Sequence, residues 1–339
     1  MRKLLLILLL VLVAPAPARA AQSVGIFYYP WFGVPALDGS YEHWGQNNHA
    51  PPLELGTAFY PMRGPYSSSS QAVVDRQMAE ISAAGVDEVI SSWWGWGSPE
   101  DARLPAVIAA ANAHGLEVAV HLEPYPGRSL SSLEADVEHL KAMGIYEFYV
   151  YEPQDLPVAD WKTLTAAEPD VRFFAQTALP GYAAAGGFAG LYTYDILVYG
   201  GSSFGRICSE AHALGLLCGP SVGPGFDSFR ATGDARVKPR RNGATYDAMW
   251  RAALGAQADF VTITSYNEWN EGTQIEPAAA SRTGYATYAG TYGVRGTDAS
   301  YAYLARTAYW TGVAATAQPA RSAPAHTVVA PPRWPRLRP

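Results

Sequence analysis

The sequence alternates between short apolar runs typical of strands and longer amphipathic stretches typical of helices. Runs rich in Val, Ile, Tyr and Phe predict eight strands, at residues 24–30, 86–94, 116–124, 147–152, 171–177, 190–195, 216–222 and 260–269. Apolar positions with helical spacing predict helices between them, at residues 70–84, 101–114, 130–143, 204–214 and 245–256. This regular alternation favours a parallel sheet, because parallel strands need long crossover connections.

Glycines stand at several predicted helix ends. Gly85, Gly115 and Gly215 each separate a helix from the next strand, where glycine readily takes the left-handed conformation that ends a helix. Eight strands with intervening helices favour a single-domain (β/α)8 TIM barrel of the α/β class over an open doubly wound sheet. No Gly-x-Gly-x-x-Gly follows the first strand, so the dinucleotide-binding fingerprint is missing and no cofactor is expected.

The two ends of the chain differ from this pattern. Residues 1–20 combine Arg2 and Lys3, an apolar run over 4–13 and a small-x-small site at 18–20, which predicts a cleaved signal peptide and a secreted or extracytoplasmic protein. The apolar run is shorter than the roughly 20 residues that cross a bilayer, although a membrane anchor stays an alternative. Residues 21–316 form the predicted catalytic domain. Residues 317–339, rich in Pro, Ala and Arg, predict a disordered tail.

Composition and charge narrow the class of ligand. The net charge of −6 argues against nucleic acid, whose binding proteins carry a basic face. The chain has 10 Trp and 21 Tyr, and aromatic rings suit sugar binding because a ring face stacks on the apolar face of a pyranose. Most of these rings are still expected to fill cores.

The two cysteines are Cys208, in a predicted helix, and Cys218, in the strand that follows it. A disulfide is conceivable in an exported chain. A helix usually packs about 10 Å from a sheet, beyond the roughly 7 Å between Cα atoms that a disulfide spans. We therefore expect two buried free thiols, with the bridge as the alternative.

In a TIM barrel the active site lies at the carboxyl ends of the strands, so polar residues there are the candidates. Along the eighth strand Val261 and Ile263 share one face, whereas Thr262, Thr264, Tyr266 and Glu268 share the other. Glu268 is therefore expected to point inward at the mouth, with Glu271 close by. Two neighbouring carboxylates with different environments suit glycosidic cleavage, although this spacing also fits a surface loop with solvated acids.

The third strand repeats this logic. Val118, Val120 and Leu122 alternate with Ala119, His121 and Glu123, so His121 and Glu123 should face inward. Glu123 is expected to accept hydrogen bonds from sugar hydroxyls, and the deeper His121 to be a hydrogen-bonded core residue. A His-x-Glu pair also suits a metal, but no further ligands stand at supporting spacing, so no metal is expected.

A rival design, with an acid at the fourth strand and a nucleophile at the seventh, does not fit. Glu152 shares its face with Phe148 and Val150, which should point to the helices, and the seventh strand ends without any Glu. No Gly-x-Ser-x-Gly nucleophile elbow occurs either.

These segments resemble glycoside hydrolase family 99, the endo-acting α-mannosidases and α-mannanases, from about Val24 to Pro277. The resemblance rests on Tyr-Tyr-Pro-Trp-Phe-Gly at 28–33, Tyr-Glu-His-Trp at 41–44, Ser-Trp-Trp-Gly at 92–95, His-Leu-Glu-Pro-Tyr at 121–125, Leu-Tyr-Thr-Tyr at 191–194, Pro-Ser-Val-Gly-Pro-Gly at 220–225 and the long motif at 264–276.

The resemblance implies a retaining hydrolase that cuts within α-mannoside chains through a 1,2-anhydro sugar. It implies that Glu268 is the base acting on the sugar 2-hydroxyl and that Glu271 is the acid/base. It also implies substrate contacts, which fall on Glu123, Tyr194, Tyr29, Asn267, Trp94 and Trp96. The Trp-rich loop is similar to that of bacterial mannanase-like members. The segments at 150–153 and 155–169 depart from the family pattern, which leaves the exact glycan open.

Two other interpretations remain. One is a related barrel hydrolase that acts on another α-linked glycan, and the other is a carbohydrate-binding barrel without catalysis. The presence of both Glu268 and Glu271 argues against the second. The expected partner is α-mannan or an α-manno-oligosaccharide, bound by a monomer that has no membrane contact after signal cleavage.

Overall fold

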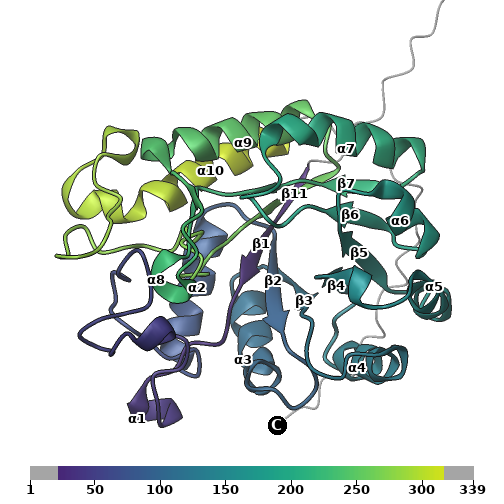
Figure 1. Cartoon of the computed structure of the whole chain (residues 1–339), viewed down its shortest axis with the longest axis horizontal. Coiled ribbons are helices and arrows are strands. Elements are labelled where there is room, and N and C mark those ends of the chain that lie inside the picture. The colour runs from purple at the N-terminus through teal and green to yellow at the C-terminus, as the bar shows by residue number, and fades with distance from the viewer. Residues whose placement is uncertain (1–21, 317–339) are drawn as a thin grey trace, which may run out of the picture.

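The computed structural model describes residues 22–316, and within them a parallel sheet is surrounded by helices (Figure 1). The predictions for residues 1–20 and 317–339 lie outside the described residues. The strands of the sheet are β1 (Ser23–Tyr28), β2 (Glu88–Trp93), β3 (Glu117–Leu122), β4 (Glu147–Val150), β5 (Arg172–Gln176), β6 (Gly190–Tyr192), β7 (Leu217–Gly219), β8 (Ser221–Val222) and β11 (Phe260–Ile263).

The sheet is a nearly closed barrel, as the sequence predicted. Its strand order is β7-β6-β5-β4-β3-β2-β1-β11-β8, and the two end strands are halves of one stretch separated by Pro220. Proline has no N–H to donate to a ladder, so it interrupts the strand there. The first half pairs with β6 and the second with β11, which brings the sheet back on itself.

Helices cover the outside of the barrel. They are α2 (Gln71–Ala83), α3 (Pro99–Ala113), α4 (Leu130–Ala142), α5 (Val158–Ala167), α6 (Pro180–Ala185), α7 (Gly201–Ala213), α9 (Ala244–Gly255) and α10 (Ala302–Thr316). The five helices predicted from periodicity are confirmed, and Gly85, Gly115 and Gly215 have the positive φ expected after a helix end. No helix among residues 22–316 is long and apolar enough to cross a membrane.

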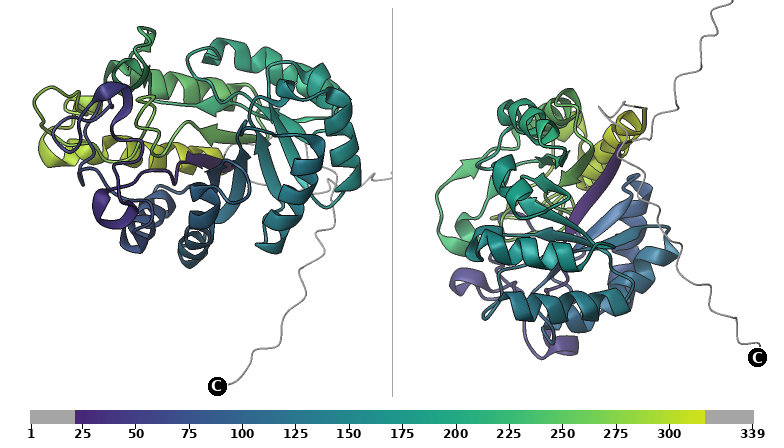
Figure 2. Two further views of the ribbon diagram at one scale, coloured as in Figure 1. Left: turned by 60° about the horizontal axis from the view of Figure 1, so that its bottom comes forward. Right: turned by 90° about the vertical axis from the view of Figure 1, so that its right-hand side faces the viewer.

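The loops at one end of the barrel contain shorter elements. These are the helices α1 (Pro35–Asp38) and α8 (Phe229–Thr232), the hairpin of β9 (Phe226–Asp227) with β10 (Val237–Lys238), and 3₁₀ turns at Gln46–Asn48, Pro153–Asp155, Arg241–Gly243, Thr291–Gly293 and Gly296–Tyr301. The last helix, α10, returns to lie beside the first strand, so both ends of the described chain contribute to the same side of the barrel (Figure 2).

Apolar residues form an inner and an outer layer. The interior holds an aromatic cluster that includes Phe27, Tyr149, Phe174, Tyr192 and Phe260. The opposite faces of the same strands pack against the helices in two larger clusters, with Val120 and Leu122 in one and Val261 and Ile263 in the other. This division confirms the strand alternation predicted for β3 and for the first residues of β11.

The prediction for the end of the eighth strand was wrong. The strand ends at Ile263 rather than at residue 269, and Tyr266 does not face the interior. Its ring lies in the outer layer, 6.0 Å from the ring of Tyr28, and its hydroxyl donates to Glu80 of α2. Alternation holds only while the strand pairs with its neighbours, and beyond Ile263 the chain folds back on itself instead.

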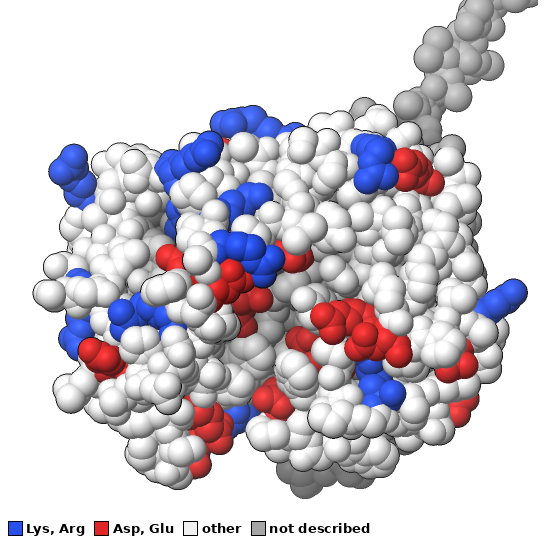
Figure 3. Space-filling model, in the orientation of Figure 1, with Lys and Arg blue, Asp and Glu red and all other residues white. Residues whose placement is uncertain are grey.

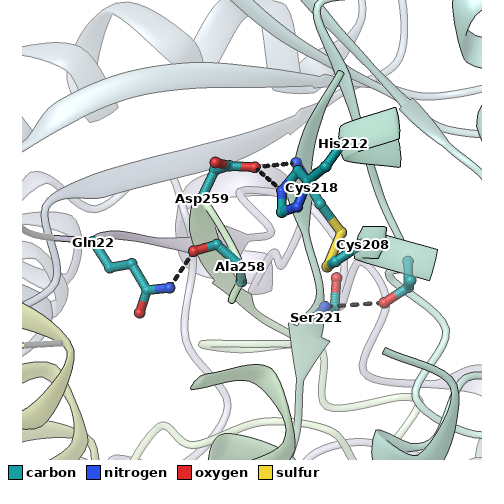
Figure 4. The surroundings of a disulfide bond; sticks show 8 residues. Gln22, Cys208, His212, Cys218, Ser221, Ala258 and Asp259 are labelled. Carbon is teal, nitrogen blue, oxygen red and sulfur yellow. Dashed lines mark hydrogen bonds and ion pairs between the residues drawn. A yellow bond between two sulfur atoms is a disulfide. The ribbon is translucent and has the colours of Figure 1, made fainter. Parts of the chain in front are cut away.

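The expectation of free thiols was also wrong, because Cys208 and Cys218 form a disulfide (Figure 4). Their Cα atoms are only 5.2 Å apart. The usual helix-to-sheet spacing is measured from the helix axis, and a Cα on the facing side lies about 2.3 Å closer to the sheet. At Cys208 the helix also approaches β7 more closely than this usual spacing. The bridge ties α7 to β7 at the place where the barrel closes.

Candidate active site

Glu123 follows β3 and continues its ladder, since its backbone N–H donates to Trp93 O at 3.1 Å. The side chain is buried and faces the barrel interior, as the alternation predicted. Its Oε1 accepts a hydrogen bond from Ser92 Oγ at 2.8 Å and lies 2.9 Å from His121 Nδ1. Contacts from two neighbouring strands therefore fix the orientation of this carboxylate.

His121 lies deeper, among the aromatic rings of the interior. Its Nε2 is 2.8 Å from the hydroxyl of Tyr192, and its ring stacks against Tyr194 with centroids 5.2 Å apart. The prediction that His121 is a hydrogen-bonded core residue is confirmed. Among residues 22–316 no group of three or more His, Cys, Asp and Glu side chains is arranged to hold a metal ion.

Glu268 lies on the turn after β11 and is only 3 % exposed. One of its carboxylate oxygens accepts the backbone N–H groups of Asn270 at 2.8 Å and Glu271 at 3.2 Å. Its own backbone N–H donates to Ser265 Oγ at 2.8 Å. The turn therefore holds the Glu268 side chain through its own main chain.

Glu271 is partly exposed and lies beside the other two acids. Desolvation, followed by the charges of Asp195 and Glu123, raises the pKa of Glu271 to about 8. Burial and the charge of Glu271 raise the pKa of Glu268 well above its usual value. The two N–H bonds to the Glu268 carboxylate stabilise its anion and oppose part of the rise in its pKa.

Two tyrosines lie within this group of acids. The hydroxyls of Tyr29 and Tyr194 are hydrogen-bonded to each other. The pKa of Tyr29 is well above its usual value because of burial and then the charges of Glu123, Glu268 and Glu271. All three carboxylates therefore lie near the same tyrosine hydroxyl. Figure 3 shows acidic side chains on both sides of a hollow in the centre of this face.

Comparison with known proteins agrees with this arrangement. The family model of glycosyl hydrolase family 99 matches residues 20–315 of the chain. The chain belongs to this family.

Relatives of known name cover most of the chain. A glycoprotein endo-alpha-1,2-mannosidase-like protein from Danio rerio is 32 % identical, over 77 % of this chain and 72 % of the relative. The Homo sapiens protein of the same name is 31 % identical, over 78 % and 70 %. A solved structure of the family 99 endo-alpha-mannosidase from Bacteroides thetaiotaomicron superposes with a TM-score of 0.77 at 26 % identity, covering 87 % of this chain and 98 % of that chain.

The remaining predicted site residues of this family 99 chain lie in three different places. Asn267 is fully buried, and its amide bonds both main-chain groups of Tyr29, at 2.7 and 3.0 Å, so it is placed to orient Tyr29. Trp94 is half-buried on the loop after β2. Trp96 is 63 % exposed and stacks on His139 of α4, with ring centroids 4.2 Å apart.

Two residues of the site were not predicted. Tyr151 packs edge-on against His121 and Tyr194, and burial followed by the charges of Glu271 and Glu123 raises its pKa. It lies two residues after the inward Tyr149 and so shares its face, which means that the strand period could have identified it. Asp195 raises the pKa of Glu271, and no pattern indicated it because it follows the short strand β6 on a turn. Glu152, by contrast, is exposed to solvent after the end of β4.

A hollow of about 480 Å³ lies elsewhere, between the N-terminal ends of α7 and α9. Its lining is mostly apolar and includes Lys238, Ala248 and Met249. None of the predicted site residues lines it, and it has no carboxylate. The chemistry of the family therefore belongs to the acid-lined mouth and not to this hollow.

Proposed function

We propose that the protein is a secreted, retaining, endo-acting α-mannoside hydrolase of the endo-α-1,2-mannosidase or mannanase type. The observation that carries the proposal is the close group of Glu268, Glu271 and Glu123 around the Tyr29 hydroxyl in a family 99 barrel. The names of the relatives support the substrate class, since they are endo-alpha-1,2-mannosidase-like proteins and an endo-alpha-mannosidase.

In the proposed first step the sugar supplies its own nucleophile. Glu268 takes the proton from the 2-hydroxyl, O2 forms a bond to C1, and the bond from C1 to the leaving oxygen breaks. Glu271 gives its proton to that oxygen, so charge and protons balance. In α-mannosides the axial O2 is trans to the leaving group, which makes this displacement possible. A pKa near 8 would keep Glu271 protonated for its role at neutral pH.

In the second step water opens the 1,2-anhydro sugar. Glu271 accepts a proton from the water as its oxygen bonds to C1, and Glu268 returns its proton to O2. Two displacements at C1 retain the α configuration. No covalent bond to Glu268 forms, unlike in the usual retaining mechanism.

The test is incubation with α-1,2-linked manno-oligosaccharides and with a glucosyl-α-1,3-mannoside. We expect internal cleavage with the α-anomer as the first product by NMR, and a kcat at least about 10³-fold lower in Glu271→Gln. Exposed Glu152→Gln is the matched control and should keep full activity. Cleavage of neither substrate would refute the mannoside assignment, and cleavage of another α-linked glycan would favour the alternative hydrolase. Full activity in Glu271→Gln would refute the site.

Export is part of the proposal. It is supported by the signal-like residues 1–20 and by the disulfide between Cys208 and Cys218, since disulfides persist mainly in oxidising compartments.

A further inference from the structure

The two proposed catalytic acids lie on a turn closed by a pair of short segments, 265–268 and 273–276. Ser265 N donates to Thr273 O at 3.1 Å, Ile275 N to Ser265 O at 2.9 Å, and Glu276 N to Tyr266 O at 2.8 Å. The positions of Glu268 and Glu271 therefore depend on how the base of this turn is held. Glu276 stands at that base.

The Glu276 carboxylate is fully buried and surrounded by donors. One oxygen accepts the Tyr66 hydroxyl and the Trp269 indole N–H, both at 2.7 Å. The other accepts Gln77 Nε2 of α2 at 2.9 Å and lies 3.4 Å from Arg63 Nε. Gln77 is oriented in turn, because its Oε1 accepts the Tyr28 hydroxyl of β1 at 2.6 Å. Glu276 thus connects the turn to the barrel wall.

The same contacts reach both neighbours of Glu268. Trp269 bonds Glu276 directly, and Asn267 bonds the hydroxyl of Tyr66, which itself donates to Glu276. We propose that Glu276 is a positioning residue that sets the place of Glu268 and Glu271 through Asn267 and Trp269. The role of Glu276 in catalysis rests on the proposed function of the two acids. The contacts that anchor the turn through Glu276 do not depend on that function.

The donors around the Glu276 side chain require both of its carboxylate oxygens as acceptors. A glutamine at this position would turn an NH₂ group toward the donors on one side, whichever way the amide lay. Either the Trp269 N–H or the Gln77 N–H would then lose its acceptor, and a buried unpaired donor drives local rearrangement. The first segment to move would be the turn that carries the acids.

The test compares Glu276→Gln with Asp247→Asn. Asp247 of α9 is also a buried carboxylate that accepts an indole N–H, from Trp310 at 2.8 Å, and pairs with Arg306, and neither partner belongs to residues 265–276. At a temperature where circular dichroism shows both variants folded, we expect kcat of Glu276→Gln to fall about 100-fold with KM within a few-fold of wild type. Asp247→Asn should keep its kcat even where its melting temperature falls as far. Equal kcat in the two variants would overturn the proposal.

Hydrogen exchange over residues 265–276, followed by mass spectrometry, gives a readout that needs no substrate. Exchange there should be faster in Glu276→Gln and unchanged in Asp247→Asn. Tyr66→Phe removes only the hydroxyl that bridges Asn267 and Glu276. It should show the same faster exchange and a kcat about tenfold lower than wild type. This variant replaces Glu276→Gln in the test if Glu276→Gln does not fold. Unchanged exchange in the folded variants would overturn the proposal, even if wild type cleaves no mannoside.

Discussion

At the residue scale, the carboxylates of Glu268 and Glu271 have different surroundings. Main-chain N–H groups bind the first, and negatively charged side chains lie near the second. Glu268 accepts two such bonds and faces the charges of Glu271 and Glu123, whereas Glu271 faces the charges of Asp195 and Glu123. Hydrogen bonds to an anion stabilise it, and neighbouring negative charges destabilise it. The pair is therefore asymmetric before any sugar binds, which suits a base and an acid that act in the same step.

The raised pKa of Glu271 predicts a basic limit to activity. A general acid must be protonated, so kcat/KM should fall as pH rises through about 8. The measurement is a pH–rate profile on a manno-oligosaccharide. Asp195→Asn removes the charge that contributes most after desolvation, and should move this limit to lower pH. A limit that stays in place would contradict the electrostatic explanation.

The same proton has an effect on stability. The folded protein holds it between pH 4.5 and about 8, where an unfolded glutamate has released it, so stability should decrease as pH rises through this range. Glu271→Gln should therefore unfold at a higher temperature than wild type at pH 8 and at nearly the same temperature at pH 4. Differential scanning calorimetry at both values would measure the difference, and a lower melting temperature at pH 8 would contradict it.

At the scale of elements, the packing of the barrel interior depends on a close contact between β7 and β11. Gly219 in β7 leaves space for Phe260 of β11, and a Cβ at Gly219 would lie 1.9 Å from that ring. Phe260 belongs to the aromatic interior, 4.8 Å from Phe174 between ring centroids. The absent side chain is therefore part of the packing below the active site.

Gly219→Ala should lower the free energy of unfolding by about 1–3 kcal/mol, because Phe260 would have to leave its position in the interior. Urea denaturation monitored by tyrosine and tryptophan fluorescence would measure this. Gly205→Ala is the matched control, since Gly205 lies within α7 and a Cβ added there would meet no other described atom within 4 Å. This control should stabilise the protein by about 0.5–1 kcal/mol. Equal effects of the two changes would contradict the packing argument.

The disulfide between Cys208 and Cys218 leads to a second prediction at the scale of elements. It closes a loop of sequence separation 10 between α7 and β7, so removing it should cost about 2–3 kcal/mol of stability. The double substitution of Cys208 and Cys218 by serine, compared with wild type with and without reductant, measures the cost by urea denaturation. Reductant should destabilise wild type and leave the variant unchanged. A variant as stable as oxidised wild type would contradict the prediction.

At the scale of the whole molecule, the predicted signal peptide and the folded domain occupy different parts of the sequence. Residues 1–20 precede the first strand, which begins at Ser23. We expect the expressed chain to be recovered outside the cytoplasm with Ala21 as its first residue, by intact-mass measurement. Replacing Ala18 and Ala20 with bulky residues should block processing at this site. A mature protein that still begins at Met1 would contradict the proposal.

The sequence by itself determined the order of the strands, five of the helices and the faces of β3 and β4, because periods of 2 and 3.6 record which side of each element is buried. It also indicated Glu123 as a strand-end acid. Only the tertiary structure placed Tyr266 in the outer layer, joined Cys208 to Cys218, and brought Asp195 to the acids. These features depend on contacts between segments far apart in the chain or on the path of turns. The local periodicity of the sequence contains no information about such long-range contacts or about the path of turns.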